Sequence, residues 1–93
     1  MGKFEVIIEP SAKIEIQQHL KSGNKAIIKK LEKIIVELTE TPYLGIGNPE
    51  ALKNNLSGYW SRRISQKDRL IYRVEENTVR VFVIAALGHY SNK

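Results

Sequence analysis

The sequence predicts an α+β fold in which two N-terminal helices pack on a small, mostly antiparallel, four-stranded sheet. Two patterns support this class. The first half carries apolar residues at helical spacing, and the second half carries runs of β-branched and aromatic residues separated by short polar connections. A chain of 93 residues has room for one hydrophobic core, so we expect residues 1–93 to form a single domain.

The first elements are a strand and a helix. The run FEVII at 4–8 is β-branched and aromatic, and it predicts a strand that ends before Glu9 and Pro10. Proline fits the first turn of a helix because its missing N–H needs no partner there. One helical face then carries Ala12, Ile16, His19 and Leu20, although Ile14 and Ile16 also permit a strand. We expect a helix over 11–21, which Ser22-Gly23-Asn24 interrupts.

A second helix follows, for which Asn24 can serve as the N-cap. Apolar residues from Ile27 to Leu38 recur on one face, opposite lysines and a glutamate. Thr41-Pro42 stops this helix because the residue before a proline is pushed out of the α region. Residues 43–58 are rich in glycine and asparagine and predict a loop, with one helical turn at PEALKN, residues 49–54.

Three strands are expected in the remainder of the chain, at 59–65, 69–74 and 78–87, joined by short hairpins. Because the helices cover one face of this sheet, strand alternation decides which side chains line the open face. A three-residue hairpin loop would place Arg63 directly across from Arg69, whereas a two-residue loop would place them on opposite faces. The sequence leaves both registers open.

The charge of the chain is positive and unevenly distributed. The net charge is +5, and from 50 to 73 six cations stand against the two acids Glu50 and Asp68, which leaves +4 of the +5 in this segment. These cations are Lys53, Arg62, Arg63, Lys67, Arg69 and Arg73. A solvated strand surface would explain part of this cluster, but planar guanidinium groups also suit bidentate contact with phosphate. A polyanion or an acidic protein is therefore the expected partner.

The same composition limits location and chemistry. The chain has no cysteine, which fits a reducing cytoplasm, and its longest apolar run, at 81–87, is far shorter than the roughly 20 residues of a membrane helix. The two histidines are far apart, and the acids lack the spacing of a metal site. GIGNPE is no phosphate-binding loop, and a G-x-S-x-G elbow is absent. We expect no metal, no cofactor and no membrane association.

Five residues could together cleave RNA without a metal. Such a site takes a proton from the 2′-hydroxyl, returns one to the departing 5′-oxygen and neutralises charge on the phosphate. Glu50 is a candidate base and His89 a candidate acid, and Lys53, Arg63 and Arg69 could hold the phosphate. Plainer explanations remain, since Glu50 could simply complement a helix N-terminus and His89 could be a surface residue.

Aromatic side chains near these residues could stack on unpaired bases, and the candidates are Tyr59, Trp60 and Tyr90. Trp60 alternates with polar neighbours, which favours a core position over a base platform. His19 lies on the inner stripe of the first helix and is expected to pack there. Arg62, the first arginine of the pair, is counted with Lys53, Tyr59 and Tyr90 among the residues that contact substrate.

From Thr41 to Tyr90 the sequence resembles the YoeB/Txe branch of the RelE-like toxins of bacterial toxin-antitoxin systems. The matching text is TPYLGIGNPEALKNNLSGYWSRRISQKDRLIY followed by GHY. It follows the family pattern T-P-F/Y, G-x-P-E-x-L-K-x-N-L-x-G-x-W-S-R-R-I, R-L-V/I-Y and a terminal H-Y. The first forty residues match this family only in outline.

The resemblance implies an mRNA endonuclease (mRNA interferase) that acts in the decoding site of the 70S ribosome and is inhibited by a cognate antitoxin. It implies that Glu50 is the general base, that His89 is the general acid and that Tyr90 positions the substrate. Lys53, Arg63 and Arg69 would then bind the phosphate, and the products would be a 2′,3′-cyclic phosphate or 3′-phosphate and a 5′-hydroxyl. It also favours a homodimer of the free protein.

Two features depart from the family pattern. Leu87-Gly88 stands where relatives often carry a basic residue, which is expected to weaken a phosphate contact, and three residues follow Tyr90. Other functions also remain open, namely a non-catalytic ParE-like toxin that binds a DNA topoisomerase, or a basic RNA-binding module that does not cut. The joint presence of Glu50 and His89 favours the nuclease.

Overall fold

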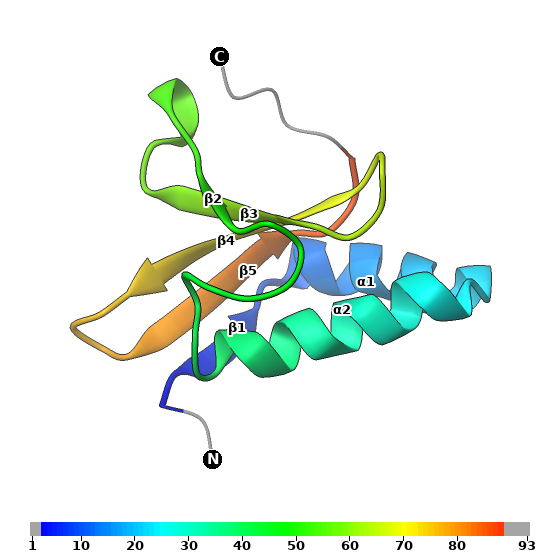
Figure 1. Cartoon of the computed structure of the whole chain (residues 1–93), viewed down its shortest axis with the longest axis horizontal. Coiled ribbons are helices and arrows are strands. Elements are labelled where there is room, and N and C mark those ends of the chain that lie inside the picture. Colours follow the sequence, from blue (N-terminus) through cyan, green and yellow to red (C-terminus); the bar gives the residue numbers. More distant parts are fainter. Residues whose placement is uncertain (1–2, 89–93) are drawn as a thin grey trace.

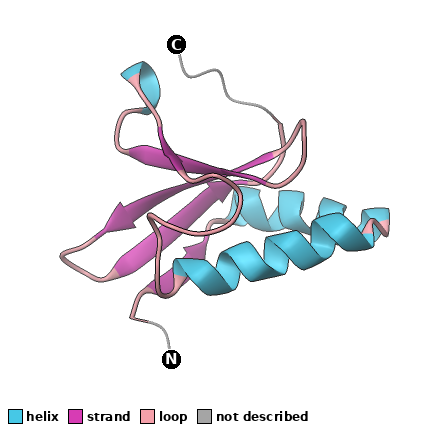
Figure 2. Cartoon of the chain, in the orientation of Figure 1, coloured by secondary structure: helices cyan, strands magenta, loops and turns pink. Residues whose placement is uncertain are grey.

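The structure is a computed structural model that describes residues 3–88. Two helices, α1 (Pro10–Ser22) and α2 (Lys25–Leu38), cover one face of a five-stranded sheet (Figures 1 and 2). The expected α+β class with two helices on a mostly antiparallel sheet is confirmed. Neither helix in the described part of the chain is long and apolar enough to cross a membrane.

The sheet has the strand order β1-β5-β4-β3-β2. Its strands are β1 (Glu5–Ile8), β2 (Glu50–Ala51), β3 (Tyr59–Arg63), β4 (Arg69–Glu75) and β5 (Arg80–Ala85). β1 runs parallel to β5, and the other neighbouring pairs are antiparallel. The expected count of four strands was therefore one too low, because β2 has only two residues and shows no alternation that a sequence pattern could reveal.

The helical turn that was expected at 49–54 does not form there, because Glu50 and Ala51 form β2. The residues of β2 pair with the free edge of β3, where Glu50 lies opposite Ser61 and the N–H of Leu52 donates to the carbonyl of Tyr59 at 2.9 Å. The helical turn forms later, as the short 3-10 helix η1 (Asn54–Leu56). An open strand edge thus decided the conformation of this segment over its weak local preference.

Local sequence signals at the helix ends act as expected. Pro10 is the first residue of α1, and Gly23 ends that helix in the left-handed conformation with φ of 75°. The Asn24 side chain caps α2 by accepting a hydrogen bond from the Ile27 N–H at 3.2 Å.

The core lies between the helices and the inner face of the sheet. Its fully or nearly fully buried residues are Ala12, Leu31, Ile34, Leu38, Ile64, Leu70, Tyr72, Val81, Val83 and Ala86. A second, smaller cluster of Leu52, Ile71 and Ala85 lies apart from this core, with Leu56, Tyr59 and Ile84 packed against it. The side of the sheet away from the helices, called the outer face below, is therefore partly covered by the segment after β2.

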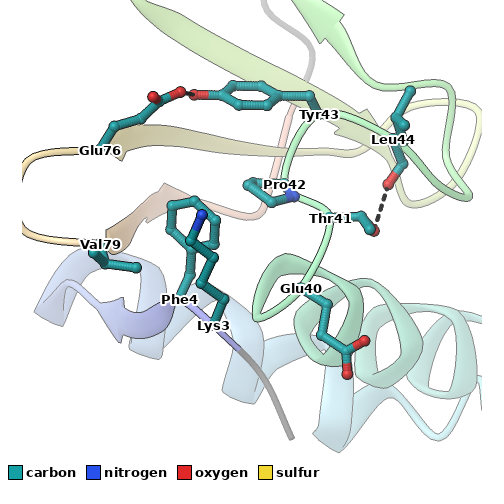
Figure 3. Close-up of a pocket in the computed structure, with 9 residues that line it drawn as sticks. All are labelled: Lys3, Phe4, Glu40, Thr41, Pro42, Tyr43, Leu44, Glu76 and Val79. Atoms are coloured by element: carbon teal, nitrogen blue, oxygen red, sulfur yellow. Dashed lines mark hydrogen bonds between the residues drawn. The ribbon is translucent and has the colours of Figure 1, made fainter.

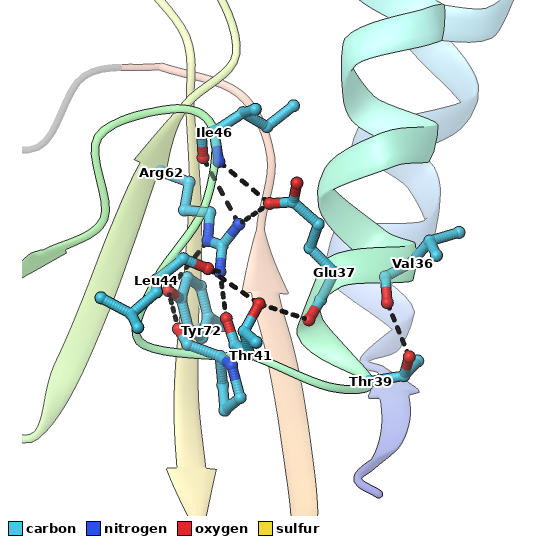
Figure 4. Close-up of polar contacts among 9 residues, drawn as sticks. Val36, Glu37, Thr39, Thr41, Leu44, Ile46, Arg62 and Tyr72 are labelled. Carbon is cyan, nitrogen blue, oxygen red and sulfur yellow. Dashed lines mark hydrogen bonds and ion pairs between the residues drawn. The ribbon is translucent and has the colours of Figure 1, made fainter. Parts of the chain in front are cut away.

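Arg62 is fully buried on the inner face, and its guanidinium joins three parts of the fold (Figure 4). Nη1 donates to Oε1 of Glu37 on α2 at 2.7 Å. Nη2 donates to the carbonyls of Thr41 and Leu44 in the loop after α2, at 2.7 and 2.8 Å. Nε donates to the hydroxyl of Tyr72 on β4 at 3.3 Å.

The expectation that Arg62 contacts substrate is therefore wrong for this structure. Strand alternation points Arg62 away from Arg63 and into the core, where carbonyls and Glu37 occupy its donors. Glu37 Oε1 also accepts the N–H of Ile46 at 2.9 Å, so the ion pair holds the loop as well as the helix. Arg62 thus fixes the loop that leads to Glu50.

We predict that Arg62→Ala lowers the free energy of unfolding by about 3–5 kcal/mol, because the carboxylate of Glu37 and the carbonyls of Thr41 and Leu44 lose the guanidinium that binds them. Urea denaturation measures this change. Arg63→Ala, at the adjacent exposed position, is the matched control and should change stability by less than about 0.5 kcal/mol. Similar losses in both variants would contradict the structural role of Arg62.

Candidate active site

The register of β3 and β4 brings two arginines together. Arg63 pairs directly with Arg69, which selects the first of the two registers that the sequence left open. Alternation then places Arg63, Ser61 and Tyr59 on the outer face with their partners Arg69, Ile71 and Arg73. Directly opposed side chains in an antiparallel pair have Cβ atoms about 4.5–5.5 Å apart, so the two guanidinium groups can reach one ligand.

Glu50 joins this face through β2. It pairs with Ser61, two residues before Arg63 on the same side of β3, and its side chain is exposed. Diagonal neighbours in a sheet lie about 7–8 Å apart, which is within reach of long side chains. The outer face therefore carries one carboxylate beside two opposed cations.

Gly47 brings the incoming loop close to β3. Its carbonyl accepts the N–H of Arg63 at 2.6 Å, and its φ of 84° is a left-handed conformation. A Cβ atom at this position would lie 3.0 Å from the carbonyl oxygen of Arg63 and 3.2 Å from Cβ of Arg62. From the sequence, the G-x-G of this loop was interpreted only as evidence against a phosphate-binding loop. The close packing of Gly47 on β3 was not predicted.

The charges on the outer face favour an anion. Opposed like charges destabilise an antiparallel pair, so the Arg63–Arg69 pair carries a local cost that a bound anion would relieve. Within residues 3–88, Nη1 of Arg69 is the buried side-chain nitrogen that has no hydrogen-bond partner. Arg73 is different, because it pairs with Glu75 and stacks 4.2 Å from the Phe82 ring centroid. Its hydrogen bond lowers the pKa of the Glu75 carboxyl.

The other candidates from the sequence differ in where they lie relative to the outer face. Tyr59 is half-buried on the outer face, and Lys53 is exposed between β2 and η1, on the segment that partly covers this face. Arg62 is absent from this face. His89 and Tyr90 lie outside the described residues, directly after Gly88.

Two residues with competing interpretations belong to the core side. Trp60 packs against the inner core, and its ring centroid lies 5.0 Å from that of Tyr43, which confirms the structural interpretation. His19 is 4% exposed, and its Nε2 lies 2.7 Å from the Ala86 carbonyl oxygen, as suits a packed histidine. Among residues 3–88, no group of three histidine, aspartate or glutamate side chains is arranged to hold a metal ion.

A separate pocket of about 360 Å³ shares no residue with the outer face (Figure 3). Lys3, Phe4, Glu40, Thr41, Pro42, Tyr43, Leu44, Glu76 and Val79 line it. The Tyr43 hydroxyl donates to Glu76 at 2.6 Å across this pocket. Burial and this hydrogen bond raise the pKa of Tyr43 to about 12, so Tyr43 is a neutral donor here at physiological pH.

Comparison with known proteins gives a consistent result. A family model described as "YoeB-like toxin of bacterial type II toxin-antitoxin system" matches residues 11–90. Toxin YoeB of Escherichia coli K12 is 43% identical over 67 residues, which cover 72% of this chain and 77% of the relative.

Solved structures agree with the sequence match. The "YoeB/ParE toxin" of Agrobacterium tumefaciens has a TM-score of 0.82 at 31% identity, covering 94% of this chain and 100% of that one. A Staphylococcus aureus YoeB–YefM complex contains a chain with a TM-score of 0.75 at 32% identity, covering 94% and 98%. The S. aureus YoeB dimer gives 0.77 at 29%, covering 95% and 99%.

We predict that Gly47→Ala destabilises the protein by about 1–3 kcal/mol, because the new methyl group meets the backbone of β3. Gly58→Ala is the matched control, since Gly58 also has a positive φ, of 94°, but nothing within 4 Å of its Cβ position. Thermal or urea unfolding of both variants measures the difference. Equal losses would assign the effect to backbone conformation alone and not to the contact with β3.

Proposed function

The chain belongs to the family of YoeB-like toxins of bacterial type II toxin-antitoxin systems, and from this premise we propose that it is a ribosome-dependent mRNA endonuclease. One observation carries the proposal. The outer face combines the exposed carboxylate of Glu50 with the opposed pair Arg63 and Arg69, and Nη1 of Arg69 is buried without a partner in residues 3–88. A base beside an anion site is what phosphodiester cleavage needs.

In the proposed reaction, the carboxylate of Glu50 takes the proton of the 2′-hydroxyl as its oxygen attacks phosphorus. Arg63 and Arg69 hold the non-bridging oxygens, where negative charge grows. The bond between phosphorus and the 5′-oxygen breaks, and His89 gives its proton to that oxygen. The products are a 2′,3′-cyclic phosphate and a 5′-hydroxyl, and side chains supply each proton transfer without a metal ion.

The remaining candidates orient the message. Lys53 adds a cation beside the phosphate site, and Tyr59 and Tyr90 offer ring faces for unpaired bases. Each stacked base contributes about 1–3 kcal/mol in single-strand binders. The ribosome would present the codon in one orientation, which leaves the protein to supply acid, base and phosphate contacts.

The proposed partners follow from the relatives. The S. aureus relative is solved as a YoeB–YefM complex and also as a dimer. For this chain we propose inhibition by a cognate antitoxin whose acidic segment covers the outer face, and a homodimer as the free form. Translating ribosomes as the target imply action in the cytoplasm.

The second candidate is a non-catalytic ParE-like toxin. The A. tumefaciens relative is described by both names, as a "YoeB/ParE toxin", which favours keeping this function as an alternative. A toxin of this kind needs neither Glu50 nor His89 for its effect. Changing Glu50 therefore separates the two candidates.

We predict that the purified protein cuts a defined message on programmed ribosomes at the decoding site, and that Glu50→Gln lowers the cleavage rate by about 10²–10⁴-fold. Mapping of RNA ends measures the positions and rates. Glu32→Gln, which changes an exposed carboxylate on α2, is the matched control and should cut at the wild-type rate. Cutting by Glu50→Gln at the wild-type rate would sink the proposed mechanism.

We also predict that binding of single-stranded RNA weakens steeply with salt. In the inactive Glu50→Gln background, Arg63→Gln and Arg69→Gln should each reduce the slope of log K against log[salt] by about 0.7, because one phosphate contact is lost. Fluorescence anisotropy at several salt concentrations measures the slopes. Lys29→Gln, an exposed change on α2, should leave the slope unchanged. Equal slopes in all variants would show that Arg63 and Arg69 do not contact the phosphates of the RNA.

A further inference from the structure

The end of β5 lies beyond the reach of its neighbour β1. β1 pairs with β5 only as far as Ile8 and Val83, because the chain enters α1 at Pro10. Beyond this pairing the chain is buried at Ala85, the last residue of β5, and at Ala86, which follows it, with 5% and 0% exposed. Buried backbone N–H and C=O groups need hydrogen-bond partners, and within residues 3–88 no strand supplies them on this side.

Side chains of α1 take the place of the missing strand. Ser11, Glu15 and His19 are spaced by four residues, so they share one face of the helix. Ser11 Oγ donates to the Ile84 carbonyl at 3.1 Å. Glu15 Oε1 accepts the N–H groups of Ala86 and Leu87 at 2.6 and 3.0 Å. His19 Nε2 lies 2.7 Å from the Ala86 carbonyl oxygen, which can only accept, so Nε2 carries the proton.

The connection between β3 and β4 binds the backbone of Gly88, the residue after Leu87. Asp68 is 5% exposed, and its Oδ1 accepts the N–H of Gly88 at 2.9 Å. The N–H of Arg69 donates to the Gly88 carbonyl at 3.0 Å. Ser65 in turn fixes Asp68, because its Oγ accepts the Asp68 N–H at 3.1 Å and donates to Oδ2 at 3.3 Å.

We propose that Glu15, His19 and Asp68 form a backbone clamp on residues 86–88 that positions His89, the next residue of the chain, for its proton transfer. The inference rests on the proposed function, in which His89 is the general acid. Arg69 connects the two sites, since its backbone N–H holds Gly88 while its side chain lies on the outer face, where the proposed function has the phosphate bind. The clamp residues do not touch substrate, and they are positioning residues rather than catalytic ones.

The first test separates binding from the chemical step. Glu15→Ala and Asp68→Ala should each lower the single-turnover rate constant at saturating ribosome by about 10- to 100-fold, because a small displacement of the acid suffices for such a loss. The concentration of half-saturation should change by less than about twofold. Glu15→Gln and Asp68→Asn retain an acceptor oxygen for the same N–H groups and should recover most of the rate. Glu32→Ala on α2 is the control.

The second test asks whether the lost step is protonation of the leaving group. A message with sulfur in place of the 5′-bridging oxygen at the cleavage position leaves as a thiolate, which needs no acid at neutral pH because a thiol pKa is about 8.5. On this linkage the alanine variants and His89→Gln should all return to within about threefold of wild type. Glu50→Gln should stay slow on both linkages, since the 2′-hydroxyl still needs a base.

The outcomes distinguish the two proposals. If Glu50→Gln and His89→Gln are slow while Glu15→Ala and Asp68→Ala cut at the wild-type rate, the clamp is wrong and the proposed function stands. Alanine variants that are equally slow on the oxygen and sulfur linkages would assign these residues a general structural role and overturn the clamp. Absence of cleavage by the wild-type protein on programmed ribosomes overturns both. Circular dichroism at the assay temperature identifies any variant that has unfolded, and the Gln and Asn variants then decide.

Discussion

The ion pair between the fully buried Arg62 and the half-buried Glu37 is the interaction on which the rest of the structure depends. It joins α2 to β3 and, through the carbonyls of Thr41 and Leu44, to the loop between them (Figure 4). A guanidinium with no exposed surface is tolerated because its donors are matched by carboxylate, carbonyl and hydroxyl oxygens. A hydrophobic residue at this position could fill the space but could not hold the carbonyls of the loop in one arrangement.

The candidate site is a consequence of that loop. Its end at Gly47 docks on β3, and the two-residue strand that follows sets Glu50 beside Ser61. The two faces of β3 therefore differ in role. Arg62 binds Glu37 and loop carbonyls on the inner face, and Arg63 lies opposite Arg69 on the outer face. Opposed arginines weaken the sheet locally, so stability and anion binding compete at this pair. The buried framework on the inner side allows the outer face to keep this unfavourable arrangement.

The end of β5 shows a second way in which a helix supports the site. A strand that loses its neighbour normally leaves backbone groups unpaired, and here a polar stripe on α1 and the turn before β4 pair them instead. The same helix therefore contributes apolar side chains to the core and polar side chains that bind the backbone of Ala86 and Leu87, shortly before His89. Under the proposed function, the loop before β2, the hairpin of β3 and β4 and helix α1 all support the end of the sheet where β3 and β5 finish and β4 begins. They carry the base, the phosphate contacts and the backbone that precedes the acid.

Local physics let the sequence predict much of this protein. Pro10, Gly23 and Asn24 mark helix ends because their backbone and capping preferences act over a few residues, and alternation correctly assigned Trp60 to the core side. The sequence also predicted the fold class and the family correctly, whereas the roles of Glu50, Arg63 and Arg69 remain proposals. Tertiary structure alone decided the two-residue strand β2, the burial of Arg62 and the register that opposes Arg63 to Arg69. It also turned Ser11, Glu15 and His19 into substitutes for a strand. The reason is physical: each of these features depends on a partner distant in the chain, and neither propensity nor spacing says which partner a side chain will meet.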